Sequence, residues 1–488
     1  MSLINISNLT FAYDGSYDNI FTDVSFRLDT DWKLGFCGRN GRGKTTFLKL
    51  LMGQYEYRGT ISADVDFEYF PFAIADKSQN TIEILSQIAP DAQIWQVQKE
   101  LSKLTVDEDV LYRSFETLSN GEQTKVMLSG LFLRENCFLL IDEPTNHLDM
   151  QGRETVARYL NGKSGFILVS HDRAFLDRCV DHILSINRAD IEIQRGNFSS
   201  WWHNKRLQDD FELAENDRLK KEIGRLTRTS REKAAWSDRI ESSKIGSGTY
   251  DRGFVGHKSA KMMKRAKSIE RRNERNLDEK SKLLKNLESA DELKLHPLTH
   301  HAPRLISLEN VTVSFGGREI FRDLTFSVER GERVALLGGN GSGKSSVLKL
   351  ICGEDIPHSG TVNTGSRLVI SYVPQDASFL TGDLSEYAMM RQIDETLLKT
   401  ILRKLDFSRV QFEKDMRDYS AGQKKKVLLA ASLCQKAHVY IWDEPLNYID
   451  VLSRIQIEEL ILTHRPTLLF VEHDRTFCDN IATKSVQI

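Results

Sequence analysis

The sequence predicts an α/β protein in which two similar domains are joined by a long α-helical hairpin. Four short motifs occur twice, in the same order and at similar spacing, and this repeat defines domains at residues 1–202 and 304–488. Residues 203–303 between them are mostly charged, with apolar side chains near the helical period. A glycine-rich segment at about residues 244–258 interrupts this pattern. We therefore expect two antiparallel helices that meet along a narrow seam and turn at a glycine-rich tip.

The composition argues against several classes of protein. The chain has six cysteines, none of them in a CxxC pair, so neither a zinc site nor a disulfide framework is indicated. No apolar run approaches the roughly 18–20 residues of a membrane-spanning helix. The N-terminus lacks the pattern of a secretory signal. We expect a cytoplasmic protein with reduced cysteines.

Charge is distributed unevenly, although the formal net charge is only -2. Bases outnumber acids between Lys244 and Arg275, and those nearest the tip are Arg252, Lys258, Lys261, Lys264 and Arg265. A basic region on a near-neutral chain indicates either contact with a polyanion or a solvated coiled-coil surface. Tyr250 and Phe254 in the tip either stack on unpaired bases or form a small apolar cap on the hairpin.

The first repeated motif is a glycine loop between a predicted strand and a predicted helix, at residues 38–45 and 338–345. Glycines let backbone N–H groups approach phosphate oxygens, and the following helix N-terminus favours an anion. Lys44 and Lys344 would bridge the outer phosphates, and a Thr or Ser hydroxyl would bind Mg²⁺. The expected phosphate-binding residues are Gly38, Asn40, Gly41, Gly43, Lys44, Thr45 and Thr46, and Gly338, Asn340, Gly341, Gly343, Lys344, Ser345 and Ser346.

Two further motifs supply acidic and imidazole groups. Asp142-Glu143 and Asp443-Glu444 end apolar strands predicted at 138–141 and 439–442. The aspartates would hold Mg²⁺, usually through water, and the glutamates would polarise the attacking water. His171 and His473 follow two other apolar strands and are expected to contact the terminal phosphate, although a lone histidine is more often structural.

The remaining motif begins a helix at Ser119-Asn-Gly-Glu-Gln and again at Ser420-Ala-Gly-Gln. A serine hydroxyl and a glycine N–H at a helix N-terminus can clamp phosphate, whereas alone they are only an N-cap. Together with the glycine loops, this motif resembles the signature of ATP-binding-cassette (ABC) ATPases, and the resemblance covers both domains. It implies two cassettes that pack head to tail within a monomeric chain, each ATP lying between the glycine loop of one and the signature of the other.

The resemblance also assigns residues to two composite sites. It joins Lys44, Asp142, Glu143 and His171 with Ser420 and Gly422, and Lys344, Asp443, Glu444 and His473 with Ser119 and Gly121. Asp149 and Asp450 match the D-loop, and the aromatic residue that stacks on adenine is matched by Phe11 or Tyr13 and by Phe315. Gln375 matches the glutamine that reaches Mg²⁺. The other residues expected to bind Mg²⁺ are Thr45, Asp142, Ser345 and Asp443. The first cassette has Phe72 at the glutamine position, and because phenylalanine cannot ligate a metal, we expect two non-equivalent sites.

Two fused cassettes with a long charged linker resemble the ABC-F subfamily, whose members work on ribosomes. Residues 443–450 (DEPLNYID), the Gly246-Ser-Gly tip and the end of the chain soon after the second histidine motif are similar to its antibiotic-resistance branch, typified by Lsa and Vga. That branch implies a 70S ribosome partner (rRNA and P-site tRNA) and a linker that enters the E site in the ATP-bound closed form. Hydrolysis would release it, and lincosamide, pleuromutilin and streptogramin A drugs would be displaced from the peptidyl-transferase centre.

Two other functions fit parts of the sequence. A housekeeping ABC-F translation factor would rescue stalled ribosomes without a drug. The ATPase subunit of an ABC transporter would need membrane partners, but it has no need of a hairpin about 60 Å long. Drug susceptibility of a sensitive host, with and without the chain, distinguishes ribosome protection from the housekeeping role.

Overall fold

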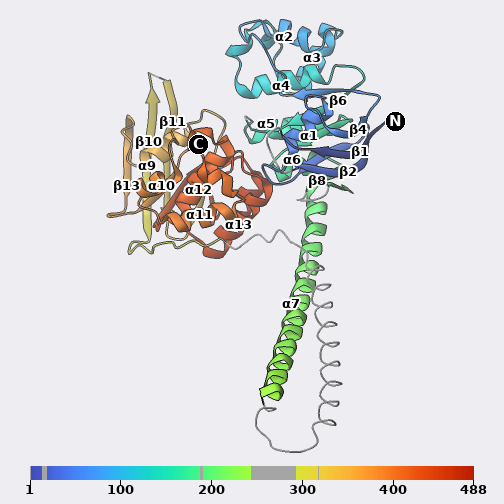
Figure 1. Cartoon of the computed structure of the whole chain (residues 1–488). Helices are drawn as coiled ribbons and strands as arrows, with labels where there is room; N and C mark the ends of the chain where they lie inside the picture. Colours follow the sequence, from blue (N-terminus) through green and yellow to red (C-terminus); the bar gives the residue numbers. More distant parts are fainter. Residues whose placement is uncertain (1, 14–18, 147, 187–190, 243–292, 317) are drawn as a thin grey trace, which may run out of the picture. The chain divides into compact units, whose positions relative to one another are not determined.

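The computed structural model describes residues 2–13, 19–146, 148–186, 191–242, 293–316 and 318–488 (Figure 1). The chain divides into two compact units: Met1–Trp201 together with Ala290–Ile488, and Trp202–Ser289. The first unit contains both copies of the sequence repeat. We call residues up to Trp201 the first cassette and residues from Arg304 the second cassette.

The first cassette contains a six-stranded sheet in the order β5-β6-β7-β3-β8-β9. Its strands pair in parallel except for β9, which is antiparallel to β8. They are β3 (Lys33–Cys37), β5 (Asp66–Phe70), β6 (Cys137–Asp142), β7 (Phe166–Val169), β8 (His182–Ile186) and β9 (Ile191–Arg195). A three-stranded antiparallel sheet, β2-β1-β4, contains β1 (Leu3–Phe11), β2 (Phe21–Asp29) and β4 (Arg58–Ser62). β6 and β7 are near-continuous apolar runs because strands of a covered parallel sheet are buried on both faces.

The second cassette repeats this architecture, which shows that the repeat in sequence is a repeat in fold. Its parallel sheet has the order β14-β15-β16-β12-β17, and its antiparallel sheet has the order β11-β10-β13. The strands are β10 (Arg304–Phe315), β11 (Arg318–Glu329), β12 (Arg333–Leu337), β13 (His358–Thr364), β14 (Ile370–Val373), β15 (Val439–Asp443), β16 (Leu468–Val471) and β17 (Lys484–Gln487).

Each cassette has helices beside its parallel sheet. In each, a helical region also lies between two of the sheet's strands in the order of the chain. The first cassette has α1 (Lys44–Leu51), α2 (Thr81–Ile88), α3 (Ile94–Lys103), 3₁₀ turns at Glu108–Tyr112 and Phe115–Thr117, α4 (Asn120–Leu131), α5 (Met150–Asn161) and α6 (Arg173–Cys179). The second has α9 (Lys344–Ile351), α10 (Leu384–Met390), α11 (Glu395–Lys404), 3₁₀ turns at Arg409–Glu413 and Met416–Asp418, α12 (Ala421–Cys434), α13 (Val451–His464) and α14 (Arg475–Ile481).

Aromatic packing holds α1 against the sheets of the first cassette. Phe47 of α1 is fully buried, and its ring centroid lies 5.6 Å from that of Phe36, 5.8 Å from that of Phe26 and 6.1 Å from that of Phe21. Phe36 belongs to β3, and Phe21 and Phe26 belong to β2. Because buried aromatic pairs at such distances are stabilising, they fix the position of the helix that follows the first glycine loop.

The segment between the cassettes begins with helix α7 (Phe198–Ser242), coloured green in Figure 1. It has 45 residues and at 1.5 Å per residue is roughly 65–70 Å long. The second helix and the tip of the predicted hairpin lie outside the described residues. Leu207 and Phe211 of α7 are 57% and 69% exposed, and because the partner helix lies outside the described residues, the seam stays a prediction.

A buried carboxylate links two helices of the first cassette. Glu100 of α3 accepts hydrogen bonds from the Tyr159 hydroxyl and the Lys163 ammonium of the α5 region, both at 2.6 Å, and from Lys103 at 2.7 Å. Burial opposes ionisation of Glu100, but the three donors outweigh it and lower its pKa to about 2. The helical region is therefore fixed to the rest of the cassette by a charge-assisted network.

The Glu100→Gln variant is expected to melt at a lower temperature at pH 7, because losing the charge from this network costs about 1–3 kcal/mol. The folded-state pKa lies below the ordinary value of 4.5. The stabilisation is therefore complete above that value and is lost as the pH falls toward 2. The difference in melting temperature between the two proteins should therefore be smaller at about pH 3 than at about pH 7.

Glu83→Gln on the exposed face of α2 is the matched control and should melt like the wild type throughout this range. If the difference between Glu100→Gln and the wild type is independent of pH, Glu100 stabilises the cassette by packing and not by its charge.

Candidate nucleotide sites

Helix α1 begins at the first glycine loop without a side-chain cap. Its N-cap is Gly43, with φ 95°, and no side chain accepts a hydrogen bond from the first turn. A Cβ atom at Gly43 would lie 2.5 Å from Cγ2 of Ile20, so only glycine fits. Lys44 Nζ donates to the carbonyl oxygens of Gly38 (2.7 Å) and Arg39 (3.1 Å), which places its charge over the loop. Uncapped N–H groups and a lysine at a helix N-terminus fit a phosphate group.

The second glycine loop has the same geometry. Gly343 is the N-cap of α9, with φ 94° and no side-chain cap. Lys344 Nζ donates to the carbonyl oxygens of Gly338 (3.0 Å) and Gly339 (2.7 Å). We call the sites around Lys44 and Lys344 the first site and the second site.

The predicted metal-binding aspartates have different environments. In the first site, Oδ2 of Asp142 accepts hydrogen bonds from Thr45 (3.0 Å) and from the Tyr69 hydroxyl (2.8 Å). In the second site, Asp443 is 1% exposed, and neither of its oxygens accepts a hydrogen bond from the described residues. Burial raises the pKa of Asp443, and the nearby Ser345 hydroxyl opposes this rise. A buried carboxylate without a donor beside a serine hydroxyl fits a bound cation.

Each glutamate after these aspartates faces a histidine. Glu143 and Glu444 have left-handed backbone conformations, with φ 51° and 46°, which turn the chain sharply at the strand end. Oε1 of Glu143 lies 3.3 Å from Nε2 of His171, and Oε1 of Glu444 lies 3.4 Å from Nε2 of His473. The structure therefore brings the candidate catalytic residues of each cassette together.

The two glutamates nevertheless have pKa values shifted in opposite directions. Burial raises the pKa of Glu143, and the adjacent Asp142 adds to the rise. Burial acts in the same direction on Glu444, but His473 and Gln375 outweigh it and lower the pKa to about 2. Phe72 stands at the position of Gln375 in the first cassette and has no polar group to offer. Gln375 therefore contributes to the difference between the two glutamates.

The signature serines begin helices, as predicted. Ser119 and Ser420 are the N-caps of α4 and α12, and each forms a capping box with the residue three positions later. A Cβ atom at Gly422 would lie 2.6 Å from the carbonyl oxygen of Tyr448. The signature of the second cassette therefore packs so closely on the loop before Asp450 that only glycine fits.

A cavity of about 900 Å³ brings the second glycine loop together with the signature of the first cassette. From the first cassette it is lined by Ser119, Asn120, Gly121, Glu122, Lys125, Asn146, Leu148, Asp149 and Gly152, and from the second by Ile320, Gly339, Asn340, Gly341, Gly343, Lys344, Ser345, Ser346, Gln375, Glu444 and His473. Its volume and its mixture of cationic, hydroxyl and carboxylate groups fit a nucleoside triphosphate.

The first site also contacts the opposite cassette. The side-chain amide of Asn40 donates to the carbonyl oxygen of Tyr448 at 2.9 Å, and its Oδ1 lies 3.1 Å from Nε2 of His171. Arg42 and Asp406 form an ion pair at 3.5 Å. A side chain within the first glycine loop therefore connects the candidate histidine with the loop before Asp450.

The D-loop aspartates shape the helices that follow them. Asp149 accepts a hydrogen bond from the Gly152 N–H (2.8 Å) and caps α5, and Asp450 accepts one from the Ser453 N–H (3.0 Å) and caps α13. Asp450 is fully buried and forms an ion pair with Lys426 at 2.9 Å. Asp149 lines the cavity of the second site, whereas Asp450 is enclosed by protein.

The residues predicted to stack on adenine in the first cassette differ in exposure. Phe11 is only 6% exposed and packs in the core of the first cassette, so it is not available to stack on a base. Tyr13 is 42% exposed, and its hydroxyl lies 2.7 Å from Oγ1 of Thr46, so it remains the candidate. Phe315 is the last residue of β10.

The candidate residues of the linker tip lie outside the described residues: Tyr250, Arg252, Phe254, Lys258, Lys261, Lys264 and Arg265.

Sequence reasoning missed Tyr69, Tyr448 and Arg153. Tyr69 precedes Phe72 by three residues as Tyr372 precedes Gln375, and Arg153 and Arg454 each follow a D-loop aspartate by four residues. This recurrence is the signal that could have identified them. Tyr448 contributes its carbonyl oxygen, so the identity of its side chain carries no signal.

Comparison with known proteins identifies the same two regions. The model of the family described as ABC transporter matches residues 21–146 and 321–447, slightly more than half of the chain. In Bacillus subtilis, the putative ATP-binding protein YdiF is 28% identical, with 100% of this chain and 80% of YdiF covered. The ribosome protection protein VmlR of the same organism is 27% identical, with 100% and 86% covered. The energy-dependent translational throttle protein EttA of Haemophilus influenzae is 26% identical, with 95% and 88% covered.

A solved structure has a similar fold. An archaeal ribosome recycling factor, in complex with a ribosomal stalk protein, matches with a TM-score of 0.64 and 19% identity, covering 98% of this chain and 87% of that chain. Within the part of the chain that the structure describes, no helix is long and apolar enough to span a membrane.

Gln375→Ala is expected to lower the rate of ATP turnover more than Phe72→Ala does. Gln375 stabilises the carboxylate of Glu444, whereas Phe72 supplies no polar group in the first site. Steady-state turnover at matched ATP occupancy is the measurement. A larger loss for Phe72→Ala would mean that the aromatic ring itself supports turnover in the first site.

Proposed function

The chain belongs to the ABC transporter family, and on that basis we propose that it is an ABC-F-type ATPase that binds ribosomes and protects them from antibiotics. The observation that carries the ATPase part is the cavity in which the second glycine loop faces the signature of the first cassette, because neither cassette forms it alone. Support for a ribosomal partner comes from VmlR and EttA, whose names describe ribosome protection and translational control.

ATP hydrolysis in each site rests on three groups of the chain. Lys44 or Lys344 and the uncapped helix N–H groups bind the phosphates. Glu143 or Glu444 orients the attacking water, and the facing histidine contacts the terminal phosphate. The signature of the opposite cassette, beginning at Ser119 or Ser420, completes the site.

The residues around the phosphates also fit Mg²⁺. Thr45 and Asp142 would hold it in the first site, and Ser345, Asp443 and Gln375 in the second. When bound, Mg²⁺ neutralises charge that develops on the β- and γ-phosphates. The lack of a donor for Asp443 among the described residues supports this assignment most directly.

The linker supplies the proposed contact with the ribosome. ATP binding closes the cassettes, the closed form occupies the E site of the 70S ribosome, and hydrolysis releases it. Lys and Arg residues between 244 and 275 attract rRNA, and the tip approaches P-site tRNA and the peptidyl-transferase centre. Lincosamide, pleuromutilin and streptogramin A drugs bind there, so displacement of the drug accounts for protection.

A housekeeping role in translation is the second candidate, and the similarity to EttA supports it. Such a factor would act on stalled ribosomes without a drug. Inhibitory concentrations in a sensitive host separate the two functions, because only ribosome protection raises them. A transporter motor, the third candidate, would sediment with membranes and not with ribosomes.

Replacing both glutamates, in Glu143→Gln with Glu444→Gln, is expected to leave ATP binding intact and to reduce hydrolysis by about 10²–10⁴-fold. The closed form should then persist on ribosomes. Co-sedimentation with 70S particles in ATP measures this, and the same variant in ADP is the control. Equal ribosome occupancy for the wild type and the double variant in ATP would count against the proposed cycle.

Replacing residues 246–256 of the tip with a short Gly-Ser linker is expected to abolish protection and leave basal ATPase activity nearly unchanged. Ribosome binding should weaken only in part, because Lys261, Lys264 and Arg265 remain and attract phosphates. Inhibitory concentrations of a lincosamide and a pleuromutilin in the same host are the measurement.

Tyr250→Ala and Phe254→Ala test the tip more finely, since stacking is worth about 1–3 kcal/mol per base. Each is expected to change the degree or the drug spectrum of protection. If the chain with the replaced tip protects as well as the intact chain, the tip is only a connector and the displacement mechanism is wrong.

A further inference from the structure

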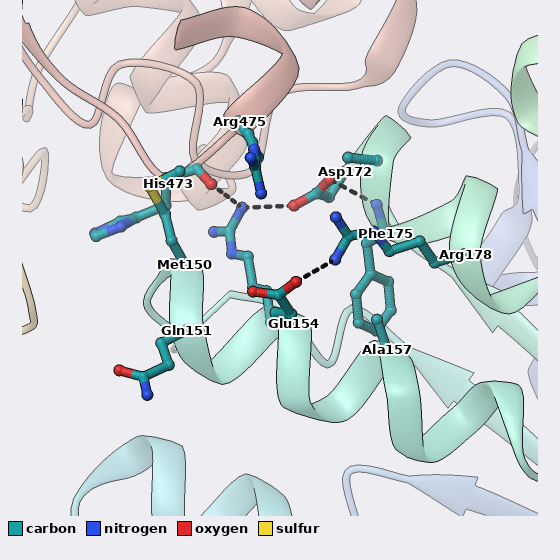
Figure 2. Close-up of a pocket in the computed structure, with 11 residues that line it drawn as sticks. Met150, Gln151, Glu154, Ala157, Asp172, Phe175, Arg178, His473 and Arg475 are labelled. Atoms are coloured by element: carbon teal, nitrogen blue, oxygen red, sulfur yellow. Dashed lines mark hydrogen bonds and ion pairs between the residues drawn. The ribbon is translucent and has the colours of Figure 1, made fainter. Parts of the chain in front are cut away.

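Arg153 of α5 connects the D-loop of the first cassette with the histidine motif of the second. It is 8% exposed, and its Nε donates to the carbonyl oxygen of Leu148 at 3.1 Å. Nη1 donates to Oδ2 of Asp172 at 2.9 Å and to the carbonyl oxygen of His473 at 3.2 Å. Figure 2 labels Asp172 and His473, which accept these two hydrogen bonds, and His473 comes from the second cassette.

The recurrent arginine of the second cassette makes a different set of contacts. Arg454 donates to the carbonyl oxygens of Ile449 and Leu446, both at 2.9 Å, and to Oδ2 of Asp474 at 3.1 Å. All three acceptors belong to its own cassette. The two arginines stand at the same offset from a D-loop aspartate, so the contact of Arg153 with the opposite cassette is a difference in tertiary structure and not in motif.

A second difference between the cassettes concerns the residues beside the two arginines, since a cavity lies next to Arg153. Glu458 of α13 forms an ion pair with Arg173 of the first cassette at 2.5 Å. At the corresponding position of α5 stands Ala157, and the residue that corresponds to Arg173 is Arg475, which pairs with Asp479 at 3.7 Å. A cavity of about 200 Å³ lies there, lined by Ala157, Arg475, Arg153 and His473 among others (Figure 2).

We propose that Arg153 is a positioning residue for the second site, holding the main chain of His473 from the opposite cassette. A guanidinium fixed by Leu148 and Asp172 presents a rigid donor, so the carbonyl of His473 is placed relative to the D-loop of the first cassette. The imidazole of His473 faces Glu444 and the cavity of the second site. The arrangement of the second site therefore depends on the packing of the first cassette against it. This inference rests on the proposed roles of Glu444 and His473.

The contact between Arg153 and His473 differs from the neighbouring ion pair between Arg173 and Glu458. Arg173 and Glu458 join the cassettes through their two side chains. Among the described residues, neither side chain forms a hydrogen bond with the main chain of a candidate catalytic residue. Arg153 bonds to the main chain of His473 itself. Loss of Arg153 should thus misplace the histidine, whereas loss of Arg173 should weaken the interface without favouring either site.

Arg153→Gln in two backgrounds tests the proposal. With Glu143→Gln only the second site turns over, and with Glu444→Gln only the first does. In the first background kcat is expected to fall by about 10–100-fold with little change in KM, the effect of a small misplacement of a reacting group. In the second background kcat should change by less than about twofold. Arg153→Lys, which keeps the charge and one hydrogen bond, should recover part of the loss.

A purely structural role for Arg153 predicts the opposite pattern. Its other partners, Leu148 and Asp172, belong to the first cassette, which also supplies Lys44 and Glu143, so a folding defect there would damage the first site most. Equal losses at both sites, or a larger loss at the first, would overturn the proposal. Arg173→Ala is the matched control and should leave the ratio of the two rates unchanged.

Hydrogen–deuterium exchange of the full chain gives a readout that does not depend on turnover. Residues 469–474 are expected to exchange faster in Arg153→Gln than in the wild type or in Arg173→Ala, and unchanged exchange in this segment would contradict the proposal. Both measurements need only the protein and ATP. Their failure is therefore distinguishable from failure of ribosome binding, which sedimentation tests separately.

Discussion

Both ATP sites depend on a helix that begins without a side-chain cap. α1 and α9 follow Gly43 and Gly343, and no side chain accepts a hydrogen bond from their first turns. In contrast, α4, α5, α12 and α13 each begin with a Ser or Asp that accepts such a bond. A phosphate can bind only where these donors remain available. The apolar strands and the aromatic cluster around Phe47 hold one such helix start in place.

Because the two cassettes repeat the same motifs, their differences show how two ATP sites in one chain can diverge. Gln375 stabilises the Glu444 carboxylate, whereas Phe72 leaves Glu143 without that support. The Tyr69 hydroxyl bonds to Asp142, while Asp443 has no donor among the described residues. Burial by itself raises the pKa of a carboxylate, and nearby donors or like charges then lower or raise it further. The two sites therefore differ in electrostatics more than in backbone geometry.

The contacts between the cassettes use main-chain carbonyl oxygens at two important positions. Asn40 donates to the carbonyl of Tyr448, and Arg153 donates to the carbonyl of His473. A carbonyl acceptor is present whatever side chain the residue carries, so substitution of the acceptor residue does not remove it. Each of these contacts therefore links a residue of one cassette to the backbone of the other.

The sequence by itself determined the repeat, the glycine loops, the strand ends that carry the carboxylates and the helix starts at Ser119 and Ser420. These features follow from local rules, because glycine backbone freedom, helix capping and the burial of apolar strands act over a few residues. Only the tertiary structure shows that Phe11 is buried whereas Tyr13 is exposed. The opposite shifts of the two glutamates, the pocket shared by both cassettes and the reach of Arg153 were also decided there. Each of them depends on groups distant in sequence, and a local pattern does not specify which distant groups meet.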